Sequence, residues 1–253
     1  MTPVDDTSGA FGACFRRLTS YVGGADDPPD RADVLAMQMV LHIEKDEPPE
    51  RTDLLVAAAR AVALLCLDDR AGASEVWAAP LDAWCGARIR KIARRARGAQ
   101  WVAAQEVSGI TAAVGTAQAR AVIPGRVGDV DRRISRLQIG GTEIDGVLPG
   151  AASAPGVCLW VNPTLEMTVG KLAAQVGHAS MLAVKLLDEQ SAYVWRENGC
   201  ALSVCHADPA RWQELLTAEA SGRAVAVRDA GYTEIAPGSV TVIATVEPTT
   251  DTG

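Results

Sequence analysis

The chain has 253 residues, with 24 basic and 31 acidic side chains and a formal net charge of -7. Hydrophobic residues make up 48% and charged residues 22%. This composition predicts a globular protein of one or two domains and argues against wholesale disorder, a collagen-like chain, a disulfide-held mini-protein and a coiled-coil rod. The negative charge also argues against a uniformly basic nucleic-acid-binding surface, although a local basic patch stays open.

The first half of the chain predicts alternating helices and strands. Residues 1–30 contain paired glycines and paired prolines and predict a flexible arm with a short helix near 11–21. After the arm we expect a strand at 37–43, a loop at 45–50, a helix at 54–67 with Thr52 or Asp53 as its cap, a helix at 82–98, and strands at 101–107 and 117–123.

The second half follows a segment with the composition of a linker. Residues 147–156 are small, uncharged and proline-bearing. Beyond this linker we expect a strand at 157–161, a loop at 163–168, a helix at 170–187, a strand at 201–205, a helix at 209–218 and strands at 224–228 and 239–246. Strands that alternate with helices on both sides of the linker predict an α/β architecture.

The six cysteines form no C-x-x-C pair, and most lie among apolar residues. They are Cys14, Cys66, Cys85, Cys158, Cys200 and Cys205. This pattern predicts reduced thiols that pack as small hydrophobic side chains. A zinc site at Cys200, Cys205 and His206 is the alternative, but the sequence lacks a second pair of ligands for it. Without a signal-peptide pattern or an apolar run of about 20 residues, we expect a cytoplasmic protein that does not enter a membrane.

Residues 167–179, MTVGKLAAQVGHA, include the start of a predicted helix that has a lysine in its first turn. Thr168 is a suitable cap, and Gly170 lets another backbone approach closely. Lys171 lies in the first turn, where the positive end of the helix dipole disfavours a cation. Its position therefore predicts an anionic partner, either a phosphate or a carboxylate. A solvated surface lysine is the alternative.

Residues 229–242, DAGYTEIAPGSVTV, follow a predicted strand and lead into the last one. Asp229 stands at the carboxyl end of its strand, where open α/β sheets bind ligands. Thr233 and Thr241 have hydroxyl groups near the same end. A loop in which these side chains merely satisfy backbone N–H groups is the alternative interpretation.

Together, GKLAAQVGHA and DAGYTEIAPGSVTV resemble the type 2 peptidyl-tRNA hydrolase family over residues 157–246. The resemblance implies hydrolysis of the ester that joins a peptide to the terminal ribose of tRNA, without a metal or other cofactor. It implies a mixed four-stranded sheet with helices on both faces. It also places the family's functional residues on Lys171, Asp229, Thr233 and Thr241, with a further match at His178 and one at Gln175.

Some positions depart from the family's pattern. Val169 stands where a basic residue is usual, Asn162 and Thr164 replace an R-x-D, and Tyr232 replaces a frequent arginine. These departures remove positive charge near the expected cleft and bear on tRNA binding more than on ester chemistry.

Ester hydrolysis needs a positioned water and stabilisation of the developing oxyanion. We expect direct attack by a water that Asp229 orients (a 2'-hydroxyl is its other possible partner), with Lys171 as an electrostatic stabiliser or a clamp on the terminal phosphate. The two threonines would bind the carbonyl oxygen or the water. His178 is expected either as a catalytic residue or as a buried structural one.

The first half resembles the second weakly, which predicts a tandem pair with a degenerate, inactive first copy. Residues 37–43 align with 157–161, 55–63 with 171–179, and 108–116 with 230–239. In this alignment Leu55 replaces Lys171, Val62 replaces His178, Val107 replaces Asp229, and Thr111 stands opposite Thr233. The predicted domains are a degenerate one at 31–146 and a hydrolase domain at 157–247. This arrangement predicts a monomer with pseudo-dimeric halves or a homodimer.

Residues 88–97, RIRKIARRAR, hold six basic side chains in ten positions. On the predicted helix they form one basic face, which is typical of phosphate-backbone binding. We therefore expect Arg88, Lys91, Arg94 and Arg95 to bind tRNA. Two other functions stay open, namely a catalytically inactive tRNA- or RNA-binding protein on the same fold, and an esterase or amidase acting on small aminoacyl or peptidyl compounds.

Overall fold

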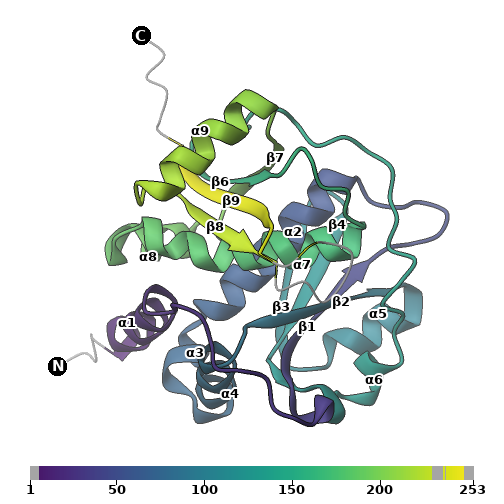
Figure 1. The fold of residues 1–253 in the computed structure, drawn as a ribbon. Coiled ribbons are helices and arrows are strands. Elements are labelled where there is room, and N and C mark those ends of the chain that lie inside the picture. The colour runs from purple at the N-terminus through teal and green to yellow at the C-terminus, as the bar shows by residue number, and fades with distance from the viewer. Residues whose placement is uncertain (1–5, 230–235, 237, 248–253) are drawn as a thin grey trace.

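The structure is a computed structural model, and it describes residues 6–229, 236 and 238–247. It contains two mixed sheets with two long helices between them (Figure 1). The first sheet consists of β1 (Leu35–His42), β2 (Arg90–Ala96), β3 (Gly109–Val114), β4 (Ala117–Val122) and the two-residue β5 (Gly125–Arg126). The second sheet consists of β6 (Gly156–Val161), β7 (Leu202–His206), β8 (Val225–Arg228) and β9 (Val240–Glu247). The predicted α/β class is confirmed.

The two sheets have the same topology. The first has the order β2-β1-β4-β3, and the second has the order β7-β6-β9-β8. In each, the first strand of the half is parallel to the second and antiparallel to the fourth. The short strand β5 adds to β1 only in the first sheet. The shared order supports a tandem of two related folds, which stays a prediction.

Helices cover both faces of each sheet. The central pair, α2 (Arg51–Cys66) and α7 (Val169–Leu182), pack along each other between the sheets. Helices α5 (Gly98–Gln105) and α6 (Arg132–Ser135) cover the outer face of the first sheet, and α9 (Pro209–Ala220) covers that of the second. The remaining helices are α1 (Asp6–Thr19), α3 (Asp69–Ala73), α4 (Glu75–Gly86), α8 (Glu189–Glu197) and the 3-10 turns at Arg31–Asp33, Val127–Asp129 and Ala183–Leu186.

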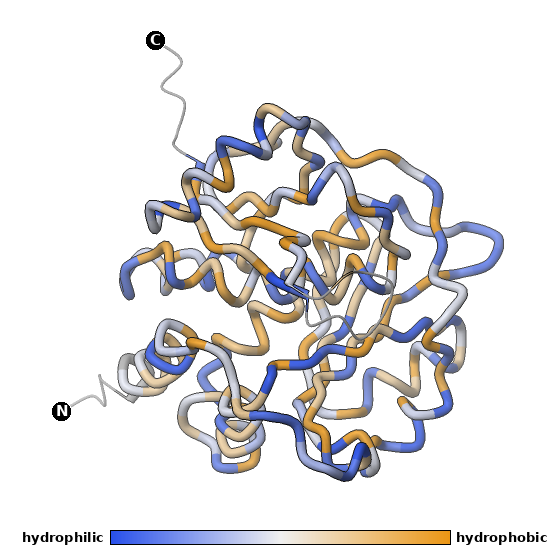
Figure 2. Tube along the Cα trace, in the orientation of Figure 1, coloured by the Kyte–Doolittle hydropathy of each residue, from blue (hydrophilic) through white to orange (hydrophobic). Residues whose placement is uncertain are grey.

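The main hydrophobic core draws side chains from both halves of the chain. Strand β1 is buried along nearly its whole length, as its mostly apolar sequence predicts, because helices lie on both of its faces. Figure 2 shows the same distribution, with apolar residues concentrated in the strands and central helices and a hydrophilic loop after β1. The two halves therefore share one hydrophobic core. Separately, no described helix is long and apolar enough to cross a membrane.

Several sequence-based expectations were wrong. The segment 82–98 is the end of α4 followed by β2, and 101–107 lies mostly in helix α5 rather than in a strand. The first helix begins farther toward the N-terminus than expected, and its Phe11 and Leu18 are buried, so this part of the predicted flexible arm is packed. Helix α2 has Glu50, not Thr52 or Asp53, at its cap position.

The proposed alignment of 108–116 with 230–239 is also wrong in its register. Residues 109–114 form β3, which holds the position that β8 holds in the second sheet. The matching landmarks are instead Trp101 and Trp212, each the fourth residue of the helix that covers an outer sheet face. Both tryptophans are buried there.

Candidate active site

The first turn of α7 is held in place by two threonines. The side chain of Thr168 accepts a hydrogen bond from the Lys171 N–H at 3.3 Å, which confirms the predicted cap. The Gly170 N–H donates to Thr142 Oγ1 at 3.0 Å, from the segment that connects the halves. A Cβ at position 170 would lie 2.9 Å from that oxygen, so any other residue here would displace the Thr142 side chain.

Lys171 pairs with a carboxylate, which is one of the two anionic partners, a phosphate or a carboxylate, that its unfavourable place in the helix predicted. Its Nζ donates to Asp229 Oδ2, and the two side chains are only 15% and 4% exposed. Asp229 directly follows β8, and its backbone is fixed by bonds from its N–H to Ser239 O and from the Gly238 N–H to its own carbonyl. The ion pair therefore joins the N-terminus of α7 to the carboxyl end of β8.

Two further side chains extend this pair into a buried network. Gln175 lies one turn after Lys171 on α7, and its Nε2 donates to Asp229 Oδ2 at 2.9 Å. Thr241, on β9, donates from Oγ1 to Gln175 Oε1 at 2.6 Å. Because the threonine donates to Oε1, the amide of Gln175 is oriented with its N–H groups toward Asp229. The network thus runs from Lys171 through Asp229 and Gln175 to Thr241.

The structure brings together three of the five predicted catalytic residues, namely Lys171, Asp229 and Thr241. Thr233 lies outside the described residues. His178 shares α7 with Lys171, but its Nδ1 lies 3.0 Å from Nζ of Lys91, on the first sheet. His178 therefore faces the other half of the chain.

The contact between His178 and Lys91 lies beside two apolar side chains. Lys91 Nζ also lies 3.2 Å from Sδ of Met181 and 4.6 Å from the centre of the Trp84 ring. Burial lowers the pKa of Lys91 to about 7. Burial, together with the positive charges of Lys91 and Lys171, lowers the pKa of His178 well below its usual value. These two groups pack the halves together.

The predicted basic helix at 88–97 is a strand for most of its length, and its cations diverge. Arg88 pairs with Asp26 at 2.5 Å. Lys91 points inward to α7, whereas Arg94 is buried on the outer face of the sheet. Arg95 donates to Gln138. Alternation along a strand sends neighbouring side chains to opposite faces, so the four do not form the single face that we expected. Their role in tRNA binding stays a prediction.

The family resemblance matches Gln175 but gives it no role in the site, and Asn162 stands in the sequence only as a departure from the family's pattern. Asn162 Nδ2 donates to Val240 O at 2.7 Å, and the Asn162 N–H donates to Thr241 O at 3.0 Å. The side chain therefore fixes the start of β9 beside Thr241. Only the strand pairing of β6 with β9 reveals this role, and that pairing is not encoded locally in the sequence.

Neither the cysteines nor any metal-ligating cluster competes with this site among the described residues. All six thiols are free, and burial raises the pKa of Cys14 and Cys85 to about 11, which suppresses the thiolate form. No group of three His, Cys, Asp or Glu side chains in the described ranges is arranged to hold a metal ion.

The network has the components of a hydrolytic site. A carboxylate that is bonded to an ammonium group and an amide N–H can also accept a hydrogen bond from water and so orient it. The ammonium group and the amide N–H of Gln175 place positive charge where an anion develops. Both lie beside the N-terminus of α7, whose dipole favours the same charge distribution.

Comparison with known proteins points to the segment that contains this network. Residues 156–252 match the family model described as peptidyl-tRNA hydrolase PTH2. The peptidyl-tRNA hydrolase of Haloquadratum walsbyi is 41% identical over 83 residues, which are 32% of this chain and 74% of that protein.

Two eukaryotic relatives are similar over shorter shares of their own length. The probable peptidyl-tRNA hydrolase 2 of Schizosaccharomyces pombe is 37% identical over 91 residues, covering 34% of this chain and 44% of that protein. The mitochondrial peptidyl-tRNA hydrolase 2 of Bos taurus is 36% identical over 108 residues, covering 40% and 60%. The family match begins at β6 and leaves the first half of the chain outside it.

Proposed function

This chain belongs to the peptidyl-tRNA hydrolase PTH2 family, and we propose that it hydrolyses the ester bond between a peptide and the terminal ribose of tRNA. The products are the free peptide and the free tRNA. The observation that carries the proposal is the buried network of Lys171, Asp229, Gln175 and Thr241, which lies wholly within the family-matched segment.

We assign each member of the network a step in direct attack by water. Asp229 accepts a hydrogen bond from the attacking water and orients it toward the ester carbonyl. Lys171 stabilises the negative charge that develops on the carbonyl oxygen, since its ammonium group lies directly beside that carboxylate. Thr241 orients Gln175, and Gln175 in turn fixes the Asp229 carboxylate. No covalent enzyme intermediate is required, and the mechanism uses no metal.

The first half is proposed as a degenerate copy that supports this site rather than a second active domain. Its core is continuous with that of the second half, and its Lys91 contacts His178 on the helix that carries Lys171. A tandem of this kind is expected to act as a monomer with pseudo-dimeric halves. Cytoplasmic residence also stays a prediction.

Within the segment 88–97, only side chains that are partly exposed to solvent can contact tRNA. Arg95 is half-buried and its side chain is bonded only to Gln138 among the described residues, so it is the member best placed to reach a phosphate. Reversing its charge in Arg95→Glu should weaken tRNA binding and flatten the salt dependence by about one phosphate contact. Unchanged binding would remove this segment from the interface.

The direct test is hydrolysis of N-acetyl-aminoacyl-tRNA by the purified protein with a metal chelator present. We expect turnover by the wild type and a loss of kcat/KM of about 10²–10³-fold in Lys171→Met. The control is Lys45→Met, which removes an exposed lysine outside the site and should leave the rate unchanged.

The same preparation distinguishes the alternative function. An inactive RNA-binding protein would bind tRNA in a salt-sensitive manner without releasing the peptide. That result would contradict the proposed hydrolysis. Release of small aminoacyl esters with no preference for tRNA would instead indicate a general esterase.

A further inference from the structure

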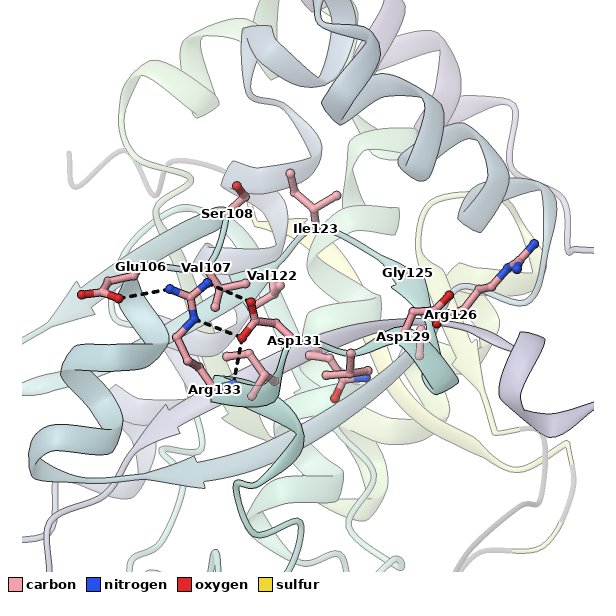
Figure 3. Close-up of a pocket in the computed structure, with 14 residues that line it drawn as sticks. Glu106, Val107, Ser108, Val122, Ile123, Gly125, Arg126, Asp129, Asp131 and Arg133 are labelled. Atoms are coloured by element: carbon pink, nitrogen blue, oxygen red, sulfur yellow. Dashed lines mark hydrogen bonds and ion pairs between the residues drawn. The ribbon is translucent and has the colours of Figure 1, made fainter.

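A pocket of about 290 Å³ lies in the first half, away from the network described above (Figure 3). Its walls come from the start of β1, the end of β4 and the segment 125–134, with Val107 and Ser108 on the remaining side. The segment 125–134 includes β5, which pairs with β1 and has no counterpart in the second sheet. The pocket is therefore a feature of the half that lacks the network.

Gln38 is the polar side chain at the inner wall of this pocket, and it is only 3% exposed. Its Oε1 accepts a hydrogen bond from Arg94 Nε at 2.8 Å. Because arginine is a donor only, this bond fixes which end of the amide is the oxygen. The opposite end, Nε2, has no acceptor among the described residues. A buried N–H group without an acceptor is unfavourable, so a ligand oxygen at this position would stabilise it.

Two buried arginines place positive charge behind the same wall. Arg94 and Arg120 stand on either side of Val40 in the sheet, and each is 8% exposed. Arg94 donates to the Gln38 amide and to the carbonyls of Ser135 and Leu137.

Arg120 donates to the Val107 carbonyl and to the Thr111 hydroxyl. Neither arginine forms an ion pair with a carboxylate of the described residues, and burial lowers the pKa of both guanidinium groups. Gln38 and Val107, which receive their hydrogen bonds, both line the pocket. The inner wall is thus electropositive.

The carboxylates at the rim are largely engaged by a rim arginine. Figure 3 shows Arg133 between Asp131 and Glu106, at 2.8 Å and 3.1 Å respectively. Asp129 and Arg126 add one charge of each sign to the lining. The charged side chains of the lining therefore sum to one net negative charge, and the two positive charges of Arg94 and Arg120 behind the inner wall exceed it.

We propose that this pocket binds a small organic anion, whose carboxylate or phosphate oxygen accepts a hydrogen bond from Gln38 Nε2. The apolar body of the ligand would pack against Val122 and Ile134, which also line the pocket. The volume is at the lower end of that of small-molecule sites, so the ligand is a small metabolite rather than a segment of a macromolecule. This site is independent of the proposed hydrolysis.

The test is calorimetric titration of the full-length protein with three probes, namely inorganic phosphate, ribose 5-phosphate and pentanoate. We expect at least one to bind with a Kd of about 1 mM or lower. Binding of the two phosphates alone would assign a phosphate ligand, and binding of pentanoate alone would assign a carboxylate. Failure of all three to bind would overturn the proposal.

The decisive variant is Gln38→Glu. It replaces the unpaired N–H donor by an acceptor and gives Arg94 a carboxylate partner, so it should fold with a Tm at or above that of the wild type. We expect it to weaken binding of the probe by at least about tenfold. Gln138→Glu is the matched control, because it makes the same change beside Arg95, outside the pocket.

A second variant guards against an indirect effect. Ser108→Trp places a large side chain at the exposed lip of the pocket and should abolish binding without altering Gln38. Equal loss of binding in Gln38→Glu and Gln138→Glu, or unchanged binding in both Gln38→Glu and Ser108→Trp, would contradict the assigned site.

Discussion

The two halves of this protein share a strand order but differ at the turn between the third and fourth strands of each half. In the first half, β3 passes to β4 through the two residues Gly115 and Thr116, with Gly115 at a φ of 53°. In the second half, the segment 229–239 joins β8 to β9, and it begins with Asp229. The same sheet therefore supports two different connections, and only the longer one supplies a carboxylate to the neighbouring helix.

The central helices show the same contrast. Counted from their cap positions, Asp53 of α2 corresponds to Lys171 of α7, rather than Leu55 as the sequence alignment suggested. A Cβ at Gly115 would lie 2.7 Å from Asp53 Oδ2, so a side chain could not replace that glycine without displacing the carboxylate. The first half thus has an acidic residue where the second half has its lysine, and a turn where the second half has its aspartate.

When α2 and α7 are matched from their cap positions, a contact made by one residue pair is repeated by the equivalent pair with the two helices exchanged. A Cβ at Gly177 would lie 3.0 Å from Val62, and Ser180 Oγ donates to Ala59 O at 2.8 Å. The correspondence equates Ala59 with Gly177 and Val62 with Ser180, so the second contact is the first one with the halves exchanged. Such reciprocity is typical of a two-fold interface and supports the tandem hypothesis. The comparison indicates that both halves contribute equivalent packing contacts between α2 and α7, whereas the Lys171–Asp229 network belongs to the second half.

The largest effect is expected from making the second turn like the first. Replacing residues 229–239 by Gly-Thr removes Asp229 and its connection but keeps β8 and β9. We expect hydrolysis to fall by about 10⁴-fold while the circular dichroism spectrum is retained. The control lengthens the Gly115–Thr116 turn by two glycines, which should leave the rate unchanged. Loss of structure in the first variant would show that the segment also stabilises the sheet.

The next effect concerns the equivalent tryptophans. Trp101 and Trp212 are 4% and 6% exposed, and each fills the outer face of its sheet. Changing either to alanine should lower the free energy of unfolding by about 3–5 kcal/mol, because a large buried side chain is lost. Denaturant titration of both variants should show one transition, since the main core spans the halves. Two separated transitions would contradict the shared core.

Two parts of the chain show how much of the structure the sequence alone can establish, namely the two site motifs and the segment 88–97. The motifs around Lys171 and Asp229 predicted the family and an anionic partner for the lysine, because each motif is local and its spacing is distinctive. The segment 88–97 could not be assigned in this way. Its apolar residues are compatible with a helix, but Arg94 is stabilised by Gln38 and by carbonyls about 40 residues away in the chain. Tertiary contacts of that kind override local propensity.

The alignment of the first half with the second also needs the structure. Alanine-rich helices resemble one another in any register, so the sequence match placed Leu55 rather than Asp53 opposite Lys171. A separate match of a few small residues placed 108–116 against the second turn. Only the pairing of β3 with β4 shows that these residues are a strand. Conversely, the fourth-position tryptophans of α5 and α9 carry a usable signal, because tryptophan is rare and its burial fixes its place.

A smaller effect is expected from changing Thr241, whose hydroxyl group donates a hydrogen bond to Gln175. Thr241→Val keeps the volume of the side chain but removes the hydrogen bond to Gln175 Oε1. Gln175 then loses the contact that orients its amide toward Asp229, so kcat should fall by about 10–100-fold with little change in KM. Thr245→Val, at another buried threonine on β9 outside the network, is the matched control. An equal loss in both variants would remove Thr241 from the site.

The smallest effect is expected in the pH dependence of the free energy of unfolding, which reports on Lys91 at the contact between the two halves. The pKa of Lys91 is about 7 in the folded protein, whereas an unfolded lysine has a pKa of about 10.4. Between these values the unfolded chain binds more protons, so the stability of the wild type rises from pH 7 to pH 10. Lys91→Met should therefore increase the free energy of unfolding by about 1 kcal/mol at pH 7, and this gain should shrink toward pH 10.

Denaturant titrations at pH 7, 8.5 and 10 measure this change, with Lys45→Met as the exposed control. The low pKa of His178 acts below pH 6.5, where protonation of the unfolded chain also reduces stability, so it does not contribute over this range. A gain that is constant with pH would show that Lys91 is not desolvated between the halves.

The central claim is that the chemistry belongs to the second half alone, and single-turnover hydrolysis of N-acetyl-aminoacyl-tRNA tests it most directly. The comparison is between Asp229→Asn and Asp53→Asn, which make the same change near the equivalent helix ends of the two halves. We predict that Asp229→Asn slows hydrolysis by about 10³-fold and that Asp53→Asn leaves the rate within about twofold of the wild type. Equal losses in the two variants, or full activity in Asp229→Asn, would contradict the account.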